Sequence, residues 1–74
     1  MSKKPVKYYV KQGYQDMPID FNIYELLSNV RVSMILDDKS ASEGTILRRL
    51  RELREENELA YEVKNARSGE YRKV

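Results

Sequence analysis

The sequence predicts a small α+β domain in which three helices are followed by a C-terminal β-hairpin. Two stretches carry this prediction. Residues 42–57 repeat apolar residues at helical spacing, and residues 59–64 and 70–74 are strand-like segments on either side of a polar, basic linker. Residues 16–41 add two shorter helical patterns. A chain of 74 residues is long enough for one domain with a small core.

Residues 1–15 are predicted to be a basic N-terminal arm or an extra short strand, and residues 16–74 to form the domain proper. Val6, Tyr8 and Val10 alternate with polar or aromatic neighbours, a period of two that favours an extended segment closed by Gly13. Residues 1–15 hold four lysines and no acid. These lysines fit either an ordinary solvated face or an arm along a phosphate backbone.

The first helix is predicted from apolar residues on one helical face: Ile19, Ile23, Leu26, Leu27 and Val30. Its start lies between residues 17 and 22, where three N-caps compete: Asp16 ahead of Pro18, Asp20, and Asn22 with Glu25. Asn29 is the predicted end. After a bridge of strand at residues 30–32, Ser33 is predicted to cap a short second helix over residues 34–39.

The third helix is predicted within residues 42–57 from a stripe of four apolar residues: Ile46, Leu47, Leu50 and Leu53. Two registers compete at its start. Ser40 with Glu43 makes a capping box, whereas Ser42 as N-cap places Glu43 in the first turn. Asn57 is the predicted end, because asparagine tolerates the left-handed conformation of a helix C-terminus.

Residue types exclude several classes of function. The chain lacks cysteine and histidine, which removes disulfides, thiol nucleophiles, thiolate metal sites and the commonest general base. We therefore expect no enzyme, no cofactor, no metal and no small-molecule substrate, and we interpret Asp37 and Asp38 as a solvated helix end. No apolar run approaches the roughly 20 residues that a membrane span needs, so we expect a cytoplasmic protein without a membrane partner.

Residues 32–53, VSMILDDKSASEGTILRRLREL, resemble the helix-turn-helix of winged-helix proteins, in which a short helix, a tight turn and a Ser-x-x-Thr-φ-x-x-x-φ recognition helix follow one another. Four residues occupy the recognition-helix positions: Ser42, Thr45, Ile46 and Leu50. Residues 55–59 resemble the end of that helix and the first wing strand, and residues 60–74 resemble the wing hairpin. The resemblance covers residues 20–74 and implies a small bacterial, archaeal or phage-type regulator with a winged helix.

We therefore expect sequence-specific binding of double-stranded DNA by a transcriptional or recombination regulator, with residues 42–57 in the major groove and the wing, residues 59–74, on the backbone or minor groove. Arginine can bind guanine bidentately, hydroxyls at a helix start suit phosphates, and Gly44 lets a backbone approach closely. The expected DNA-binding residues are Ser42, Gly44, Thr45, Arg48, Arg49, Lys64, Asn65, Arg67, Ser68 and Arg72.

The charged and aromatic residues also allow interpretations other than DNA binding. Three i, i+4 pairs would make the third helix an ordinary charged surface: Arg48 with Glu52, Arg51 with Glu55, and Arg54 with Glu58. We favour such pairing for Arg51 and Arg54, and DNA contact for Arg48 and Arg49. Three tyrosines are interpreted as core residues with exposed hydroxyls: Tyr24, Tyr61 and Tyr71.

Two further hypotheses concern partners. A homodimer could form if the segment Val6 to Val10 pairs with its twin as an edge strand. The near-neutral net charge of +2 also fits a protein–protein interaction module that uses a winged-helix scaffold. A third reading makes residues 42–57 one half of an antiparallel helical dimer without a wing.

Overall fold

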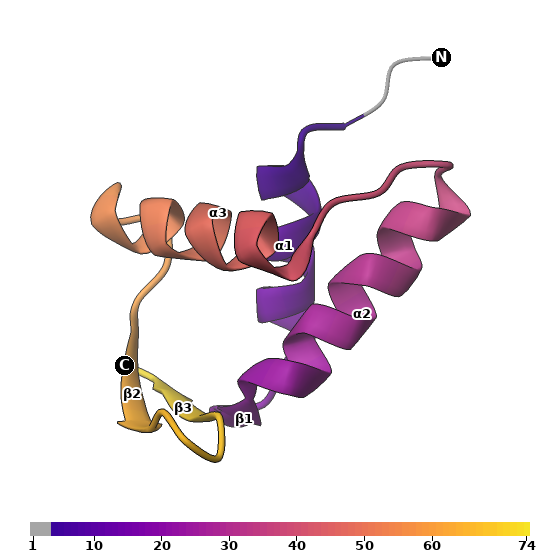
Figure 1. Ribbon diagram of the computed structural model, residues 1–74. Coiled ribbons are helices and arrows are strands. Elements are labelled where there is room, and N and C mark those ends of the chain that lie inside the picture. The colour runs from indigo at the N-terminus through magenta and orange to yellow at the C-terminus, as the bar shows by residue number, and fades with distance from the viewer. Residues whose placement is uncertain (1–3) are drawn as a thin grey trace.

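A computed structural model describes residues 4–74, and within this range the protein is a small α+β domain of three helices and a three-stranded antiparallel sheet (Figure 1). The elements follow in the order α1 (Val6–Asp16), β1 (Asp20–Asn22), α2 (Ile23–Leu36), α3 (Glu43–Glu55), β2 (Tyr61–Asn65) and β3 (Glu70–Lys73). The sheet order is β1-β3-β2, so the first strand pairs with the last. Among the residues described, no helix combines the length and the hydrophobicity needed to cross a bilayer.

The predicted N-terminal strand is wrong, because residues 6–16 form α1. Val6, Tyr9, Val10 and Gly13 follow one another at helical spacing, and the last three are buried. Gly13 does not end the element. The part of the predicted arm at residues 1–3 lies outside the described residues. Because residues 6–10 are helical, they cannot pair with a second copy as an edge strand, so that hypothesis is also wrong.

Helix α1 packs closely on α2 at Gly13. A Cβ atom at this position would lie 2.8 Å from Val30 Cγ2 and 3.0 Å from Leu26 Cδ1, so only the absence of a side chain allows this approach. Val30 and Leu26 are both fully buried. The contact places α1 against both other helices, and Tyr14, near the C-terminal end of α1, contacts Tyr61 and Lys73 of the hairpin.

Helix α2 runs without interruption where the sequence predicted two helices and a bridge. Of the three proposed N-caps, Asn22 is confirmed: its Oδ1 accepts a hydrogen bond of 2.8 Å from the backbone N–H of Tyr24. The predicted stop at Asn29, the strand bridge and the cap at Ser33 are wrong. Val30 and Met34 extend the buried stripe and are both fully buried, so packing overrides the weak local stop signals.

The third helix and the hairpin agree with the prediction. Ser42 is the N-cap of α3, and its Oγ accepts from the backbone N–H of Thr45 at 3.2 Å, which decides between the two registers. Asn57 has the predicted left-handed conformation, with φ of 63°. Gly69, with φ of 78°, closes the hairpin turn. Strand β1, which completes the sheet, was not predicted.

The core lies where the three helices meet the inner face of the sheet. Phe21, Tyr71 and Val63 stand opposite one another in the strand register and therefore share this face. Tyr61 is buried and Tyr71 is half-buried, as the sequence predicted, but Tyr24 is 57% exposed, so its prediction as a core residue is wrong. The buried apolar residues are Tyr9, Val10, Met17, Phe21, Ile23, Leu26, Leu27, Val30, Met34, Ile46, Leu50, Leu53, Leu59 and Tyr61.

Candidate functional site

Three acids, one near the end of α3 and two in the turn that follows it, are held on the flank facing α1: Glu52, Glu56 and Glu58. Lys7 Nζ lies 2.7 Å from Glu56 Oε2 and 3.6 Å from Glu52 Oε1, and Lys11 Nζ lies 3.4 Å from Glu58 Oε1. The hydrogen bond to Glu56 raises the pKa of Lys7. Two lysines of α1 therefore form ion pairs with three carboxylates at the end of α3 and in the following turn, and offset their negative charge.

Arg49 belongs to the same flank. Its Nη1 donates to both carboxylate oxygens of Glu52 at 2.9 Å, and this hydrogen bonding lowers the pKa of Glu52. Arg49 is half-buried, whereas Arg48 is exposed. The structure thus separates two neighbouring residues that the sequence placed together in one DNA-binding set.

The three i, i+4 ion pairs expected along α3 are absent from residues 4–74: Arg48 with Glu52, Arg51 with Glu55, and Arg54 with Glu58. The interpretation of Arg51 and Arg54 as members of ordinary surface pairs is therefore wrong. Arg54 instead places its guanidinium 4.7 Å from the centre of the Tyr61 ring. Arg48, Arg51 and Arg54 are exposed and make no ion pair with any residue in the described range.

The start of α3 presents small groups beside Arg48. The Ser42 and Thr45 hydroxyls lie 3.0 Å apart and hydrogen-bond each other, while Ser42 Oγ also caps the helix. Gly44 is exposed, and a Cβ atom there would have Ser42 Oγ as its nearest neighbour at 4.0 Å. This capped end of α3 therefore leaves open space beside Gly44.

The hairpin turn uses two of its predicted site residues for its own structure. Asn65 Oδ1 accepts from the backbone N–H groups of Arg67 and Ser68, at 3.0 Å and 3.3 Å. The Ser68 hydroxyl donates to Glu70 Oε2 at 2.6 Å, and the Ser68 carbonyl accepts from Asn22 Nδ2 at 3.1 Å. Arg67 remains as the exposed cation of the turn.

Lys64 and Arg72 point to the other side of the sheet. Lys64 Nζ and Arg72 Nε each lie 3.8 Å from Asp20 Oδ1, and Arg72 stands opposite Asp20 in the strand register. Because successive residues of a strand alternate between its faces, this is the face opposite to that of Tyr71. The structure does not bring these two cations together with the arginines of α3.

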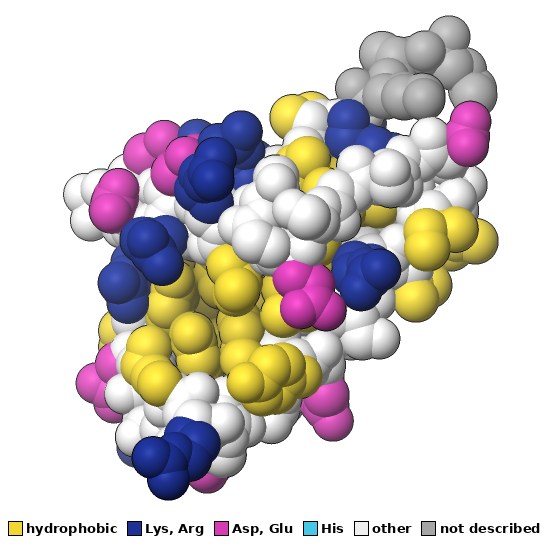
Figure 2. Space-filling model, viewed as in Figure 1, with side chains coloured by type: hydrophobic (Ala, Val, Ile, Leu, Met, Phe, Trp, Pro, Cys, Tyr) yellow, Lys and Arg dark blue, Asp and Glu magenta, His cyan; other side chains and the backbone are white. Residues whose placement is uncertain are grey.

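A hollow of about 210 Å³, lined by both apolar and arginine side chains, lies between α3 and the hairpin. Figure 2 shows apolar side chains exposed between these elements, with lysine and arginine side chains above and below them. The residues that line the hollow are Leu47, Leu50, Arg51, Arg54, Tyr61, Val63 and Tyr71. Arg51 and Arg54 are therefore site residues that the sequence reasoning missed. Their positions three and six residues after Arg48, along the exposed side of the helix, were the available signal.

Comparisons of this chain with protein-family models, with curated proteins and with solved structures find no match. The chemistry of the site is therefore the basis for a function, because a fold by itself does not define an activity.

Proposed function

We propose that this protein is a winged helix-turn-helix regulator that binds double-stranded DNA, with α2 and α3 as the helix-turn-helix and β2 and β3 as the wing. The order of elements supports this proposal, since a helix and a strand precede two helices and a hairpin, and the first strand joins the hairpin in one antiparallel sheet. Relative to the sequence resemblance, α2 takes the place of the short helix expected at residues 34–39. Helix α3 keeps its role as the recognition helix.

One observation carries the proposal: three arginines along the exposed side of α3 have no carboxylate partner within residues 4–74. Glu52, Glu56 and Glu58 pair with α1 or with Arg49, which leaves Arg48 and Arg54 without their i+4 partners. Glu55, the i+4 neighbour of Arg51, is exposed on the same side of α3 and makes no ion pair in the described range. Duplex DNA presents a dense row of phosphates, and unpaired cations release its condensed counterions without first breaking an ion pair. The modest net charge of the chain therefore understates the charge of this face.

The positions of the exposed arginines and hydroxyls suit different parts of a DNA duplex. Arg48 lies in the half of α3 nearest its N-terminus, the part of a recognition helix that reaches base edges. Arg51 and Arg54, closer to the hairpin, suit phosphates, as do the hydroxyls of Ser42 and Thr45 at the helix start. Arg67 in the wing turn suits the backbone or the minor groove.

A fluorescence anisotropy titration with random duplex DNA over a range of salt concentrations tests this proposal. Four free arginines, each meeting one phosphate, predict a log–log slope of about −3.6, and about −2.7 if Arg48 contacts a base instead. Absence of binding at the lowest salt concentration would contradict the proposal.

Two neighbouring arginines provide a matched comparison. Arg51→Ala should make the salt slope shallower by about 0.9. Arg49→Ala should leave the slope unchanged, because Arg49 is already paired with Glu52. Equal effects of the two substitutions would show that the exposed side of α3 is not the DNA-binding surface.

The base-reading role needs a different measurement. Arg48→Ala should cost roughly 1 to 3 kcal/mol on a preferred site selected from a random library, and much less on random DNA. Arg67→Ala should weaken binding to both by similar factors. If Arg67 governs sequence choice and Arg48 only the salt slope, the wing is the reading element.

The hollow between α3 and the hairpin favours a second candidate function, a protein–protein interaction module. Leu47, Val63 and Tyr71 provide apolar surface, which binding to phosphates does not require, and Arg51 and Arg54 border this surface. This combination suits an acidic peptide with an apolar anchor residue. Two results together would support this candidate instead. The parent protein would bind such a peptide but no duplex DNA, and Val63→Glu would abolish binding of the peptide.

A further inference from the structure

Helix α2 is apolar on two sides, and the proposed DNA-binding surface uses neither of them. Its inner side supplies five core residues: Ile23, Leu26, Leu27, Val30 and Met34. Its outer side exposes Tyr24, Val32, Ile35 and Leu36 at 57, 54, 64 and 80%. Clustered exposed apolar groups mark interaction surfaces.

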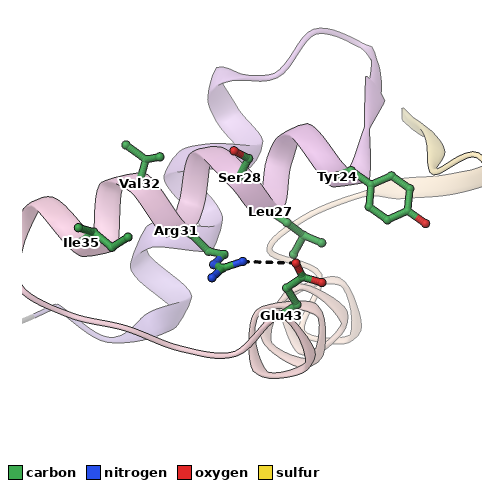
Figure 3. Close-up of a pocket in the computed structure, with 7 residues that line it drawn as sticks. All are labelled: Tyr24, Leu27, Ser28, Arg31, Val32, Ile35 and Glu43. Carbon is green, nitrogen blue, oxygen red and sulfur yellow. Dashed lines mark hydrogen bonds and ion pairs between the residues drawn. The ribbon is translucent and has the colours of Figure 1, made fainter.

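The outer side of α2 has a regular shape. Tyr24, Ser28, Val32 and Leu36 are spaced by four residues and form one ridge along the helix, and Ile35 lies in the adjacent row. We call these five residues the α2 outer face. Figure 3 shows Ser28 and Val32 on the same side of α2, while Arg31 reaches toward Glu43 at the start of α3.

The two charged residues that border the hollow on this side of α2 are paired with each other, whereas Glu25, two turns before Val32, is exposed and makes no ion pair in the described range. Arg31 Nη1 lies 3.4 Å from Glu43 Oε1, and these two residues are the charged groups that border the hollow of about 290 Å³ on this side of α2. The five residues of the α2 outer face are themselves uncharged, so an identical face can meet them without placing like charges directly opposite each other.

We propose that the α2 outer face binds the same face of a second copy of this chain, with the two α2 helices antiparallel about a two-fold axis at Val32. The sizes of the side chains support this arrangement. Residues four positions either side of Val32 are Ser28 and Leu36. An antiparallel pair centred on Val32 therefore seats Leu36 of each copy on the small Ser28 of the other, as interdigitating i±4 ridges do.

The two-fold symmetry also determines on which side of the dimer the two α3 helices lie. The two-fold axis is perpendicular to α2 and lies in the plane of the contact, so it keeps the flank that carries Arg31 and Glu43 on the same side in both copies. Both α3 helices then start on one side of the dimer, an arrangement that suits paired half-sites on one duplex. Dimerisation itself does not depend on DNA binding.

The expected affinity is modest. A standard interface buries about 800 Å² on each partner, with about 20 to 30 residues a side. The α2 outer face has five residues, so the dimer should form at micromolar concentrations or above.

Sedimentation velocity of the whole protein without DNA, from micromolar to millimolar concentrations, tests the proposal. We expect a reversible monomer–dimer equilibrium whose dissociation constant rises at least about tenfold in Leu36→Glu, a loss of about 1.4 kcal/mol. Ile19→Glu is the matched control, since Ile19 is 63% exposed but lies outside the α2 outer face, and it should leave the equilibrium unchanged. A monomer at all concentrations, or equal loss in both variants, would overturn the proposal.

A size exchange separates this specific contact from general stickiness. Ser28→Leu adds apolar surface but fills the position that receives Leu36, so it should weaken the dimer. The double variant Ser28→Leu with Leu36→Ser reverses the large and small positions and should recover much of the association. Stronger association in Ser28→Leu, or no recovery in the double variant, would overturn the proposed packing. Because no DNA is present, these results are independent of the proposed function.

Discussion

The contact between α1 and α2 at Gly13 leads to a quantitative prediction. Replacing Gly13 by alanine adds a methyl group inside a helix, which alone should stabilise the protein by about 0.5 to 1 kcal/mol. The same methyl group would lie 2.8 Å from Val30 Cγ2, whereas carbon atoms in contact prefer about 3.5 to 4.0 Å. Val30 is fully buried and, being β-branched, is restricted in its side-chain rotation, so it cannot move aside freely.

Relief of this overlap should cost about 1 to 3 kcal/mol, which outweighs the gain in helix propensity. Gly13→Ala should therefore destabilise the domain by about 1 kcal/mol. Gly44→Ala is the matched control. It makes the same change in α3, where the nearest atom to the new methyl group is Ser42 Oγ at 4.0 Å, so it should stabilise the protein by up to about 1 kcal/mol.

Urea denaturation of the two variants and the parent, followed by circular dichroism, measures both effects. The midpoints should move in opposite directions with unchanged slopes. If Gly13→Ala stabilises the protein as much as Gly44→Ala does, then α1 and α2 do not approach as closely as the structure has them.

Three further predictions concern stability. Leu50→Ala, at a residue only 2% exposed, should cost roughly 2 to 5 kcal/mol and largely unfold so small a domain, and a thermal melt like the parent's would contradict its core position. Gly69→Ala should cost at least about 1 kcal/mol in urea denaturation, because its φ is positive and the new methyl group would lie 2.7 Å from the Tyr24 ring. Arg49 lowers the pKa of Glu52, so this carboxylate stabilises the fold above about pH 4.3 and loses that effect as the pH falls through its lower folded pKa. Glu52→Gln should therefore flatten the acid side of the stability profile, and an unchanged profile would count against the pair.

The α3 helix and the hairpin could be predicted from the sequence because their signals are local. Ser42 caps α3 through its own side chain, and Asn57 and Gly69 stand where the backbone turns left-handed. Each signal acts within a few residues and needs no distant partner. The same is true of Asn22, one of three caps proposed for α2.

Long-range packing decided the N-terminal half. Residues 6–10 fit a period of two, but Val6, Tyr9 and Val10 also fit a helical face, and long-range packing, including the contact of Gly13 with α2, favours the helix. Helix α2 continues beyond Asn29, the predicted end, because Val30 and Met34 on its inner side are buried in the core. Strand β1 has three residues and exists through its pairing with β3, which lies about 50 residues later in the chain.

The charges of α3 show the same division between sequence and structure. The sequence determined that arginines and glutamates alternate along this helix, but an i, i+4 pair contributes only about 0.2 to 0.5 kcal/mol, too little to fix which partner each carboxylate takes. Packing of α1 brought Lys7 and Lys11 to Glu52, Glu56 and Glu58, across more than 40 residues of chain, and left Arg48 and Arg54 exposed without a carboxylate partner in the described range. The identity of the charged groups was therefore encoded locally, whereas their availability to a partner was set by tertiary contacts that no local pattern contains.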